Sequence, residues 1–267
     1  MSQARFSVRT AVAEGFEFWR GNVLRAIGPL VIAAGGLVLL LTARSFAALA
    51  AGFALYGLAG LAAQAALYRI SLADAGAGPA TRNGPFGLQW RGLETRFVAV
   101  SLLTAALLGI VAVIAAFIIA GLLVGLIGVP AATTATTPEA LLALLTPTGA
   151  LIFNLAALAA MAGLLVLNAR LSLAFPATAA ENRVRVISSI ALTRGSVLRI
   201  LGATLLINLP IILMQSLAGL FGDAMRSPES SLWTQLIVGV ISTFFYVPIS
   251  VGMTSYIYRR LRGSAGQ

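Results

Sequence analysis

Three segments of the chain place two arginines five residues apart, with a glycine directly after the first arginine. They read WRGNVLR at Trp19–Arg25, WRGLETR at Trp90–Arg96 and TRGSVLR at Thr193–Arg199. A guanidinium group stays charged at cellular pH, and its planar fork can donate to two phosphate oxygens at once. The spacing therefore predicts phosphate binding by six residues: Arg20, Arg25, Arg91, Arg96, Arg194 and Arg199.

The rest of the sequence offers few groups for catalysis. It contains no cysteine and no histidine, which excludes thiol nucleophiles, the usual base near neutral pH and zinc sites built from these residues. The eight acidic residues are scattered singly: Glu14, Glu17, Asp74, Glu94, Glu139, Glu181, Asp223 and Glu229. No G-x-S-x-G segment and no phosphate-loop motif is present. We therefore expect a protein without enzymatic activity, catalytic residues, metal or cofactor.

The chain is too apolar for a soluble protein. Of its 267 residues, 59% are hydrophobic and only 10% are charged, and its mean hydropathy is +0.97. Soluble domains are about 45–50% apolar and about 25% charged. A soluble fold with the present composition would expose large apolar patches, which promote aggregation. The composition therefore predicts a lipid bilayer as the solvent.

Six apolar runs are long enough to cross the ~30 Å hydrocarbon core of a bilayer as helices. They lie near residues 26–43, 46–68, 97–129, 149–169, 199–220 and 233–258. The runs are continuous rather than alternating, which favours helices over a β-barrel. Because the polar connections are short, we expect an all-α, polytopic protein with residues 1–267 in a single membrane domain.

All 18 basic residues are arginines, and they are distributed unevenly among the connections. Alternate connections, starting from the N-terminal segment, hold 16 of them, and the other connections hold two. The positive-inside rule places the 16 in the cytoplasm, together with both termini. These arginines lie at the ends of apolar runs, so we expect anionic phospholipids as partners and no nucleic acid. Simple anchoring at the membrane explains the same arginines as phosphate recognition does.

No ionisable residue lies near the middle of a span, which argues against a proton pump or a channel with charged rings. Six polar or kink-forming residues are expected to be buried within the spans: Gln64, Asn154, Asn208, Pro210, Gln215 and Pro248. They would either line a cavity at the centre of the bundle or join helices through hydrogen bonds. We favour hydrogen bonding, which is common between membrane helices.

The chain also has the pattern of three repeated helical hairpins. An Arg-Gly segment precedes each odd-numbered span, and YRISLA at Tyr68–Ala73 resembles ARLSLA at Ala169–Ala174, each after an even-numbered span. The pattern predicts parallel hairpin units over residues 20–72, 91–173 and 194–262, related by rotation about the membrane normal. The alternative is that arginine and glycine recur by chance where helices enter a membrane.

Two segments outside the spans have helical patterns. Residues 5–20 carry apolar side chains on one face and charged ones on the other. This predicts a helix on the cytoplasmic membrane surface, within an interfacial segment over residues 1–25. A solvated helix packed on neighbouring loops fits the same pattern. The sequence Thr137-Pro138-Glu139 is typical of a helix start, so a short helix is expected on the outer surface.

Short motifs near the fourth and fifth spans resemble a known family. They are RLSLAFPA at Arg170–Ala177, Glu181, ALTRGSVLR at Ala191–Arg199, and Asn208 followed by Leu209 and Pro210. The pattern is similar to that of the YciC-type bacterial inner-membrane proteins, and to the membrane domain fused to some glycerophosphodiester phosphodiesterases. The resemblance implies a multi-pass protein of the bacterial inner membrane. It does not imply the phosphodiesterase activity, because this chain contains no phosphodiesterase domain.

Together these patterns favour a non-enzymatic inner-membrane protein that engages anionic phospholipids or a membrane protein partner and serves envelope organisation. Gly121 and Gly125 form a GxxxG motif, which permits close packing within the monomer or, less favoured, in a homo-oligomer. The alternative function is a transporter or permease subunit for a lipid or a small amphiphile. A hydrated cavity at the bundle centre would favour that alternative.

Overall fold

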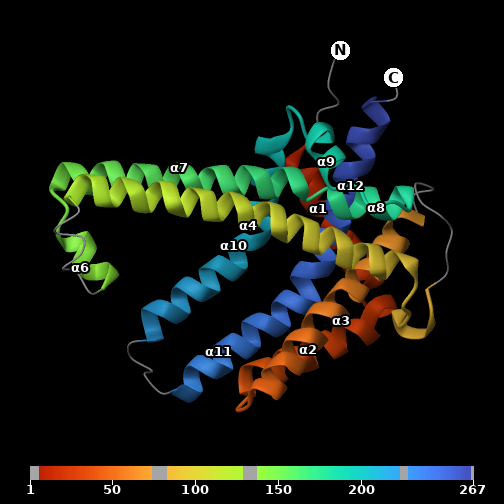
Figure 1. The fold of residues 1–267 in the computed structure, drawn as a ribbon. Coiled ribbons are helices and arrows are strands. Elements are labelled where there is room, and N and C mark those ends of the chain that lie inside the picture. The colour runs from red at the N-terminus through yellow and green to blue at the C-terminus, as the bar shows by residue number, and fades with distance from the viewer. Residues whose placement is uncertain (1–5, 74–82, 129–136, 223–227, 266–267) are drawn as a thin grey trace. The chain divides into compact units, whose positions relative to one another are not determined.

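The computed structural model describes residues 6–73, 83–128, 137–222 and 228–265, and these are helical with no strand among them (Figure 1). The elements in chain order are α1 (Val8–Asn22), η1 (Val23–Ala26), α2 (Ile27–Thr42), α3 (Phe46–Ala73), η2 (Pro85–Gly87), α4 (Gly92–Ile127), α6 (Pro138–Ala143), α7 (Pro147–Leu171), α8 (Ala174–Glu181), α9 (Ile187–Leu192), α10 (Val197–Gly222), α11 (Pro228–Ile241), η3 (Ser242–Tyr246) and α12 (Val247–Ala265).

Six helical segments of the described chain are long and apolar enough to cross a membrane, which confirms the prediction of six spans at the level of length and composition. They are Val8–Thr42, Phe46–Ala73, Pro85–Ile127, Pro147–Glu181, Val197–Met214 and Leu232–Gly263. The most apolar windows of the third and fourth segments have 0% of their residues buried by other parts of the chain. Exposed side chains such as Phe117 and Leu158 fit a lipid environment.

The chain divides into two compact units. Unit 1 comprises residues 1–101 and 169–267, and unit 2 comprises residues 102–168. Unit 2 therefore holds α6 and most of α4 and α7, whereas the other helices belong to unit 1. The prediction of one domain over residues 1–267 stays a prediction.

The packed core of unit 1 lies around the last turns of α3, where every residue from Ala65 to Leu72 is buried. This part of α3 packs against α8 and α12. Phe97, at the start of α4, stacks edge-on against Tyr68 at 5.7 Å between ring centroids and against Phe175 of α8 at 5.2 Å. Edge-to-face aromatic pairs stabilise a core by about 0.5–1.5 kcal/mol beyond their buried area. The aromatic cluster therefore joins three elements that are distant in the sequence.

Small residues set the close packing of helix pairs in unit 1. A Cβ atom on Gly36 of α2 would lie 2.5 Å from the backbone nitrogen of Tyr56 on α3. A Cβ atom on Gly15 of α1 would lie 2.6 Å from the carbonyl oxygen of Ile249 on α12. Backbone atoms cannot move aside as a flexible side chain can, so these two glycines permit the approach of α2 to α3 and of α1 to α12.

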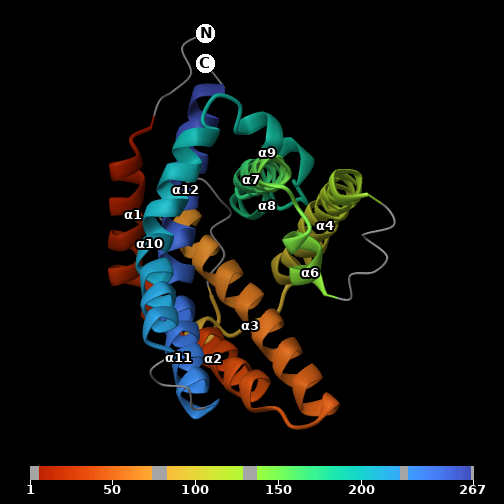
Figure 2. The same cartoon turned by 90° about the vertical axis from the view of Figure 1, so that its left-hand side faces the viewer.

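Helix α1 lies beside α12 and α10 (Figure 2). Ala11 and Gly15 are buried against α12 and α10, whereas Arg9 and Glu17 on the other face are exposed. The amphipathic helix predicted over residues 5–20 is therefore present, with its apolar face packed against other helices. Its position at the membrane surface stays a prediction.

The last span is one continuous helix that contains a π-helical segment, η3, between α11 and α12. Pro248 follows this segment and has no N–H group, so it cannot donate to the carbonyl of Phe244 four residues earlier. The indole Nε1–H of Trp19 donates to that carbonyl oxygen at 2.9 Å. The rings of Trp19 and Phe245 also lie 4.7 Å apart. The tryptophan of the first Arg-Gly segment thus satisfies a carbonyl released by a proline in the last span.

The helix start predicted at Thr137-Pro138-Glu139 is confirmed, because the Thr137 side chain accepts a hydrogen bond from the Ala140 nitrogen at 3.2 Å and α6 follows. The location of α6 on the outer membrane surface stays a prediction. The three Arg-Gly segments differ in backbone structure. Gly21 lies within α1, Gly92 is the first residue of α4, and Gly195 lies in the turn before α10 with φ of 74°. The three-hairpin repeat therefore stays a prediction.

Candidate functional site

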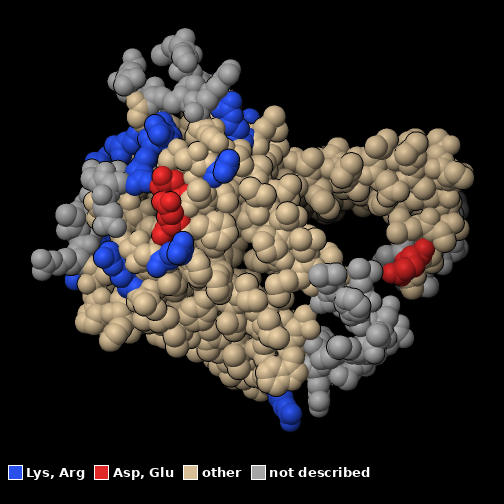
Figure 3. Space-filling view, turned by 180° about the vertical axis from the view of Figure 1, so that it is seen from behind, with Lys and Arg blue, Asp and Glu red and all other residues tan. Residues whose placement is uncertain are grey.

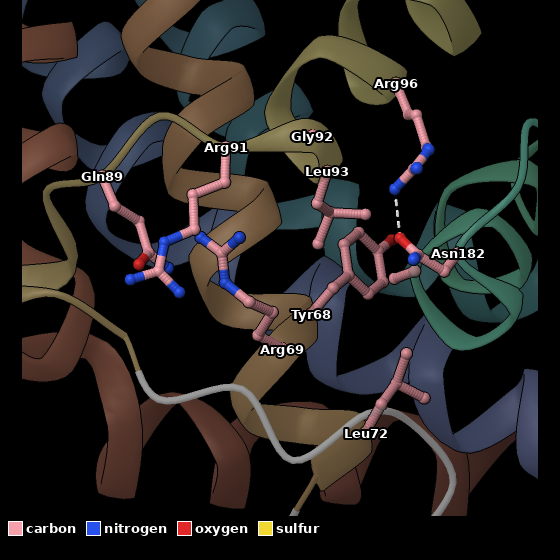
Figure 4. A pocket seen from close by; sticks show the side chains of 10 residues that line it. Tyr68, Arg69, Leu72, Gln89, Arg91, Gly92, Leu93, Arg96 and Asn182 are labelled. Carbon is pink, nitrogen blue, oxygen red and sulfur yellow. Dashed lines mark hydrogen bonds between the residues drawn. The ribbon is translucent and has the colours of Figure 1, made fainter.

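A pocket of about 320 Å³ lies in unit 1, between the end of α3, the start of α4 and the end of α8 (Figure 4). Its lining residues are Tyr68, Arg69, Leu72, Gln89, Arg91, Gly92, Leu93, Arg96, Ala179 and Asn182. Three of these are arginines, and none is acidic. The chemistry of the pocket therefore depends on how these three cations are held.

Arg69 and Glu94 form a buried ion pair beside the pocket. Their side chains are only 5% and 0% exposed, and a terminal nitrogen of Arg69 donates to Oε1 of Glu94. The Nε of Arg69 donates to Oδ1 of Asn83 at 2.9 Å. A buried charge is tolerated only when it is paired and hydrogen-bonded, and here both conditions are met. The pair fixes the start of α4 against the end of α3.

Glu94 has a second role at the start of α4. Its Oε2 accepts a hydrogen bond from the backbone nitrogen of Arg91 at 2.8 Å, as the acidic residue of a capping box does. A carboxylate in the first turn also interacts favourably with the helix dipole. One buried side chain thus determines both where α4 begins and how Arg91 is placed beside the pocket.

The loop before α4 forms one wall of the pocket and is held by side-chain amides. Asn83 donates to the carbonyl oxygen of Ala66 on α3 at 3.2 Å and accepts from Nε2 of Gln89 at 3.2 Å. The Oε1 of Gln89 accepts from the backbone nitrogen of Gly84 at 3.1 Å. These bonds engage both the oxygen and the nitrogen of the Gln89 amide, so this wall of the pocket is polar.

Arg96 reaches the pocket from the opposite wall. Its guanidinium donates to Oδ1 of Asn182, and Figure 4 shows the two side chains pointing toward each other. Asn182 ends α8 in the left-handed conformation with φ of 54°, which asparagine tolerates better than most residues. The α8 terminus therefore positions one arginine of the pocket.

The electrostatics of the pocket favour an anion. Arg69 and Arg91 extend toward the same part of the pocket in Figure 4, with Gln89 beside them. The Arg91 side chain is exposed, and within the described residues its guanidinium has no hydrogen-bond or ion-pair acceptor. Gly92 and Leu93 also line the pocket, and their N–H groups belong to the first turn of α4, where intrahelical acceptors are lacking. Guanidinium groups and a helix N-terminus both attract phosphate and carboxylate groups.

The structure brings together two of the six arginines predicted to bind phosphate, Arg91 and Arg96. Arg20 at the end of α1, Arg25 in η1 and Arg194 before α10 are exposed, and none of them lines this pocket. Arg199 on α10 is half-buried and also lies outside it. On the face shown in Figure 3, most basic side chains gather in one region with acidic side chains among them, and the remaining described surface is largely uncharged.

Sequence reasoning missed Arg69 and Glu94. Arg69 belongs to the segment YRISLA, which the prediction used only as evidence for a repeat. Glu94 lies three residues after Arg91, the spacing of a capping box, so its role at the helix start was readable from the sequence. The pairing of Arg69 with Glu94 was not readable, because it depends on the packing of α3 against α4.

The residues predicted to be buried within the spans have different environments. Gln64 and Asn208 are half-buried and Pro248 is buried, whereas Pro210 is exposed and the Gln215 side chain lies outside the described residues. Asn154 on α7 is also exposed, and its predicted place within a span stays a prediction. Asn208 donates to the carbonyl of Thr204 at 2.8 Å and to the hydroxyl of Tyr246 at 3.3 Å, so it joins α10 to η3. None of these six residues lines the pocket.

Comparisons of the chain with protein-family models, with curated proteins and with solved structures find no match. The resemblance to the YciC-type proteins is carried by the short motifs alone. Within the described residues, no group of three or more acidic, cysteine or histidine side chains could hold a metal ion. The pocket and its arginines are therefore the feature on which a functional proposal rests.

Proposed function

We propose that this protein is a non-enzymatic, multi-pass protein of the bacterial inner membrane that binds the phosphate groups of anionic phospholipids and serves envelope organisation. The observation that carries the proposal is the pocket in which Arg91 and Arg96 lie beside the buried Arg69 and the first turn of α4. A site of this kind supplies directed N–H donors and positive charge. Phosphate oxygens are the matching acceptors.

The position of the pocket along the chain supports a lipid as the source of the phosphate. The pocket lies where the second candidate span ends and the third begins. The positive-inside rule places this connection in the cytoplasm, and the cytoplasmic leaflet is rich in anionic headgroups. Each arginine near such a surface contributes about 1 kcal/mol to the attraction. With both termini on that side, the exposed Arg20, Arg25 and Arg194 would face the same headgroups.

The alternative, a transporter or permease subunit for a lipid or a small amphiphile, would use polar groups inside the spans. Asn208 is the best placed of these, and its amide nitrogen already donates to Thr204 and Tyr246. The pocket is lined instead by residues at the ends of helices. This arrangement favours a binding protein over a transporter.

The test is lipid analysis by mass spectrometry of the protein purified in native lipid discs. We compare the wild type with the double variant Arg91→Lys and Arg96→Lys, which keeps the charge and the topology signal but removes the planar fork. Loss of about one hydrogen bond per arginine, at about 1 kcal/mol, lowers bound anionic lipid by about fivefold for each residue. Arg9→Lys is the matched control, because Arg9 is exposed on α1 and lies outside the pocket.

Unchanged anionic lipid in the double variant would overturn the proposal and leave simple anchoring as the role of these arginines. A second outcome would also overturn it: unchanged lipid together with loss of a co-isolated membrane protein. That result would identify the pocket as part of a protein interface.

A further inference from the structure

The charge balance of the pocket goes beyond a general affinity for anions. Among the described residues, the pocket is lined by three guanidinium groups, on Arg69, Arg91 and Arg96. One carboxylate, on the buried Glu94, pairs with Arg69 beside the pocket. Glu94 is fully buried and paired with Arg69, so it cancels one of the three positive charges. The remaining charge is that of two cations, supplemented by the N-terminus of α4.

We infer that the pocket takes a phosphomonoester group, such as a lipid that ends in a free phosphate, in preference to a phosphodiester headgroup. The inference rests on the proposed function and deepens it by naming the headgroup class. A phosphomonoester carries a charge of about −1.5 to −2 at neutral pH and has three terminal oxygens that accept strong hydrogen bonds. A phosphodiester carries a single negative charge and has only two such oxygens. The doubly charged group is the one that matches two uncompensated guanidinium groups.

The pocket also offers more N–H donors than the two terminal oxygens of a phosphodiester can accept from. The whole guanidinium group of Arg91 is available to a ligand, because no acceptor among the described residues bonds to it. Arg96 has one terminal nitrogen directed at Asn182, and its other N–H groups have no acceptor among the described residues. Arg69 uses its Nε for Asn83 and one terminal nitrogen for Glu94, and the described residues provide no acceptor for its second terminal nitrogen. Together with the N–H groups of Gly92 and Leu93, these donors come from several directions, and three terminal oxygens can accept from more of them than two can.

Glu94 sets this preference by acting through Arg69. Without the carboxylate, Arg69 would be a buried cation without its ion-pair partner, and the pocket would hold three positive charges. With it, Arg69 is held by two directed hydrogen bonds, one to Asn83 and one to Glu94. Glu94 is thus a positioning residue, and its charge determines the charge of the ligand.

The experiment uses full-length protein in phosphatidylcholine nanodiscs that contain either phosphatidate or phosphatidylglycerol at the same mole fraction. Native mass spectrometry measures the number of anionic lipids retained by the protein. We expect the wild type to retain phosphatidate about fivefold more than phosphatidylglycerol, the ratio that one additional ionic contact gives. Arg91→Gln removes one charge and should bring the ratio close to one. Arg9→Gln, an exposed arginine outside the pocket, should leave the ratio unchanged.

The outcomes separate this inference from the proposed function. If the wild type retains both anionic lipids equally and Arg91→Gln with Arg96→Gln loses both, lipid binding stands and the phosphomonoester preference is wrong. If neither lipid is retained above phosphatidylcholine, the lipid proposal itself fails.

Inorganic phosphate added to the discs distinguishes a lipid headgroup from free phosphate as the source of the bound phosphate group. If phosphate displaces phosphatidate from the wild type and not from Arg91→Gln, the pocket recognises the phosphate itself. If phosphatidate is retained unchanged, the lipid chains are required.

Discussion

Replacing Glu94 with glutamine tests whether the buried ion pair holds the start of α4 against α3. The substitution keeps the shape of the side chain and an amide oxygen that can still accept from the Arg91 nitrogen, so the helix cap is retained. It removes the charge opposite Arg69, whose side chain is only 5% exposed. Breaking a buried pair by removing one partner is destabilising by about 3–5 kcal/mol. Because the cap survives, we expect about 3 kcal/mol, which corresponds to a fall of roughly 6–12 °C in the unfolding temperature.

The assay is circular dichroism of the helical signal against temperature, with the protein in one fixed detergent. Glu17→Gln is the matched control, because Glu17 is exposed on α1 and its replacement should leave the unfolding temperature unchanged. A rescue variant, Arg69→Met with Glu94→Leu, replaces the pair with apolar side chains, and such replacements are often neutral or stabilising. Equal unfolding temperatures for Glu94→Gln and Glu17→Gln would refute the reasoning that this pair organises the site.

Two further predictions concern topology and the last span. A reporter fused at Thr134 should lie outside the cytoplasm and one fused after Gln267 inside, because 16 of the 18 arginines lie in connections on the side of the termini; finding both reporters on one side would exclude six spans. Trp19→Phe should keep the ring packing but lose the hydrogen bond to the Phe244 carbonyl, which lowers the free energy of unfolding by about 1–3 kcal/mol in denaturant titration; a stability equal to that of the wild type would show that water replaces the indole N–H.

The spans were predictable from the sequence because a single physical quantity, the length of an apolar run, decides whether a helix can cross a bilayer. The start of α6 was predictable for a similar reason. Thr137 caps the helix through a bond to Ala140, only three residues away, and local bonds leave a local pattern. Neither prediction needed any knowledge of which helices are neighbours.

Contacts between distant segments left no such pattern. The bond from Trp19 to the Phe244 carbonyl joins residues 225 positions apart. Pro248 marks a kink-forming position in the sequence, but it does not indicate which side chain satisfies the carbonyl that the proline releases. The Arg-Gly segments show that similar sequences can also have different backbone structures. Gly92 begins a helix, whereas Gly195 has a positive φ, because glycine adopts either conformation without strain.

The arginines of this protein differ in environment, and the sequence alone does not distinguish them. Some positions need the guanidinium geometry, whereas others need only a positive charge. Arg69 is buried and donates from two nitrogens in fixed directions, to Asn83 and Glu94. A lysine ammonium carries the same charge but cannot reproduce this planar geometry, so charge alone does not explain an arginine at this position. Arg20 and Arg194 are exposed, and for them the positive charge near the membrane surface is sufficient. A single residue type would thus serve folding at one end of α3 and topology elsewhere, and the proposed anion site lies where the buried Arg69 meets the exposed Arg91.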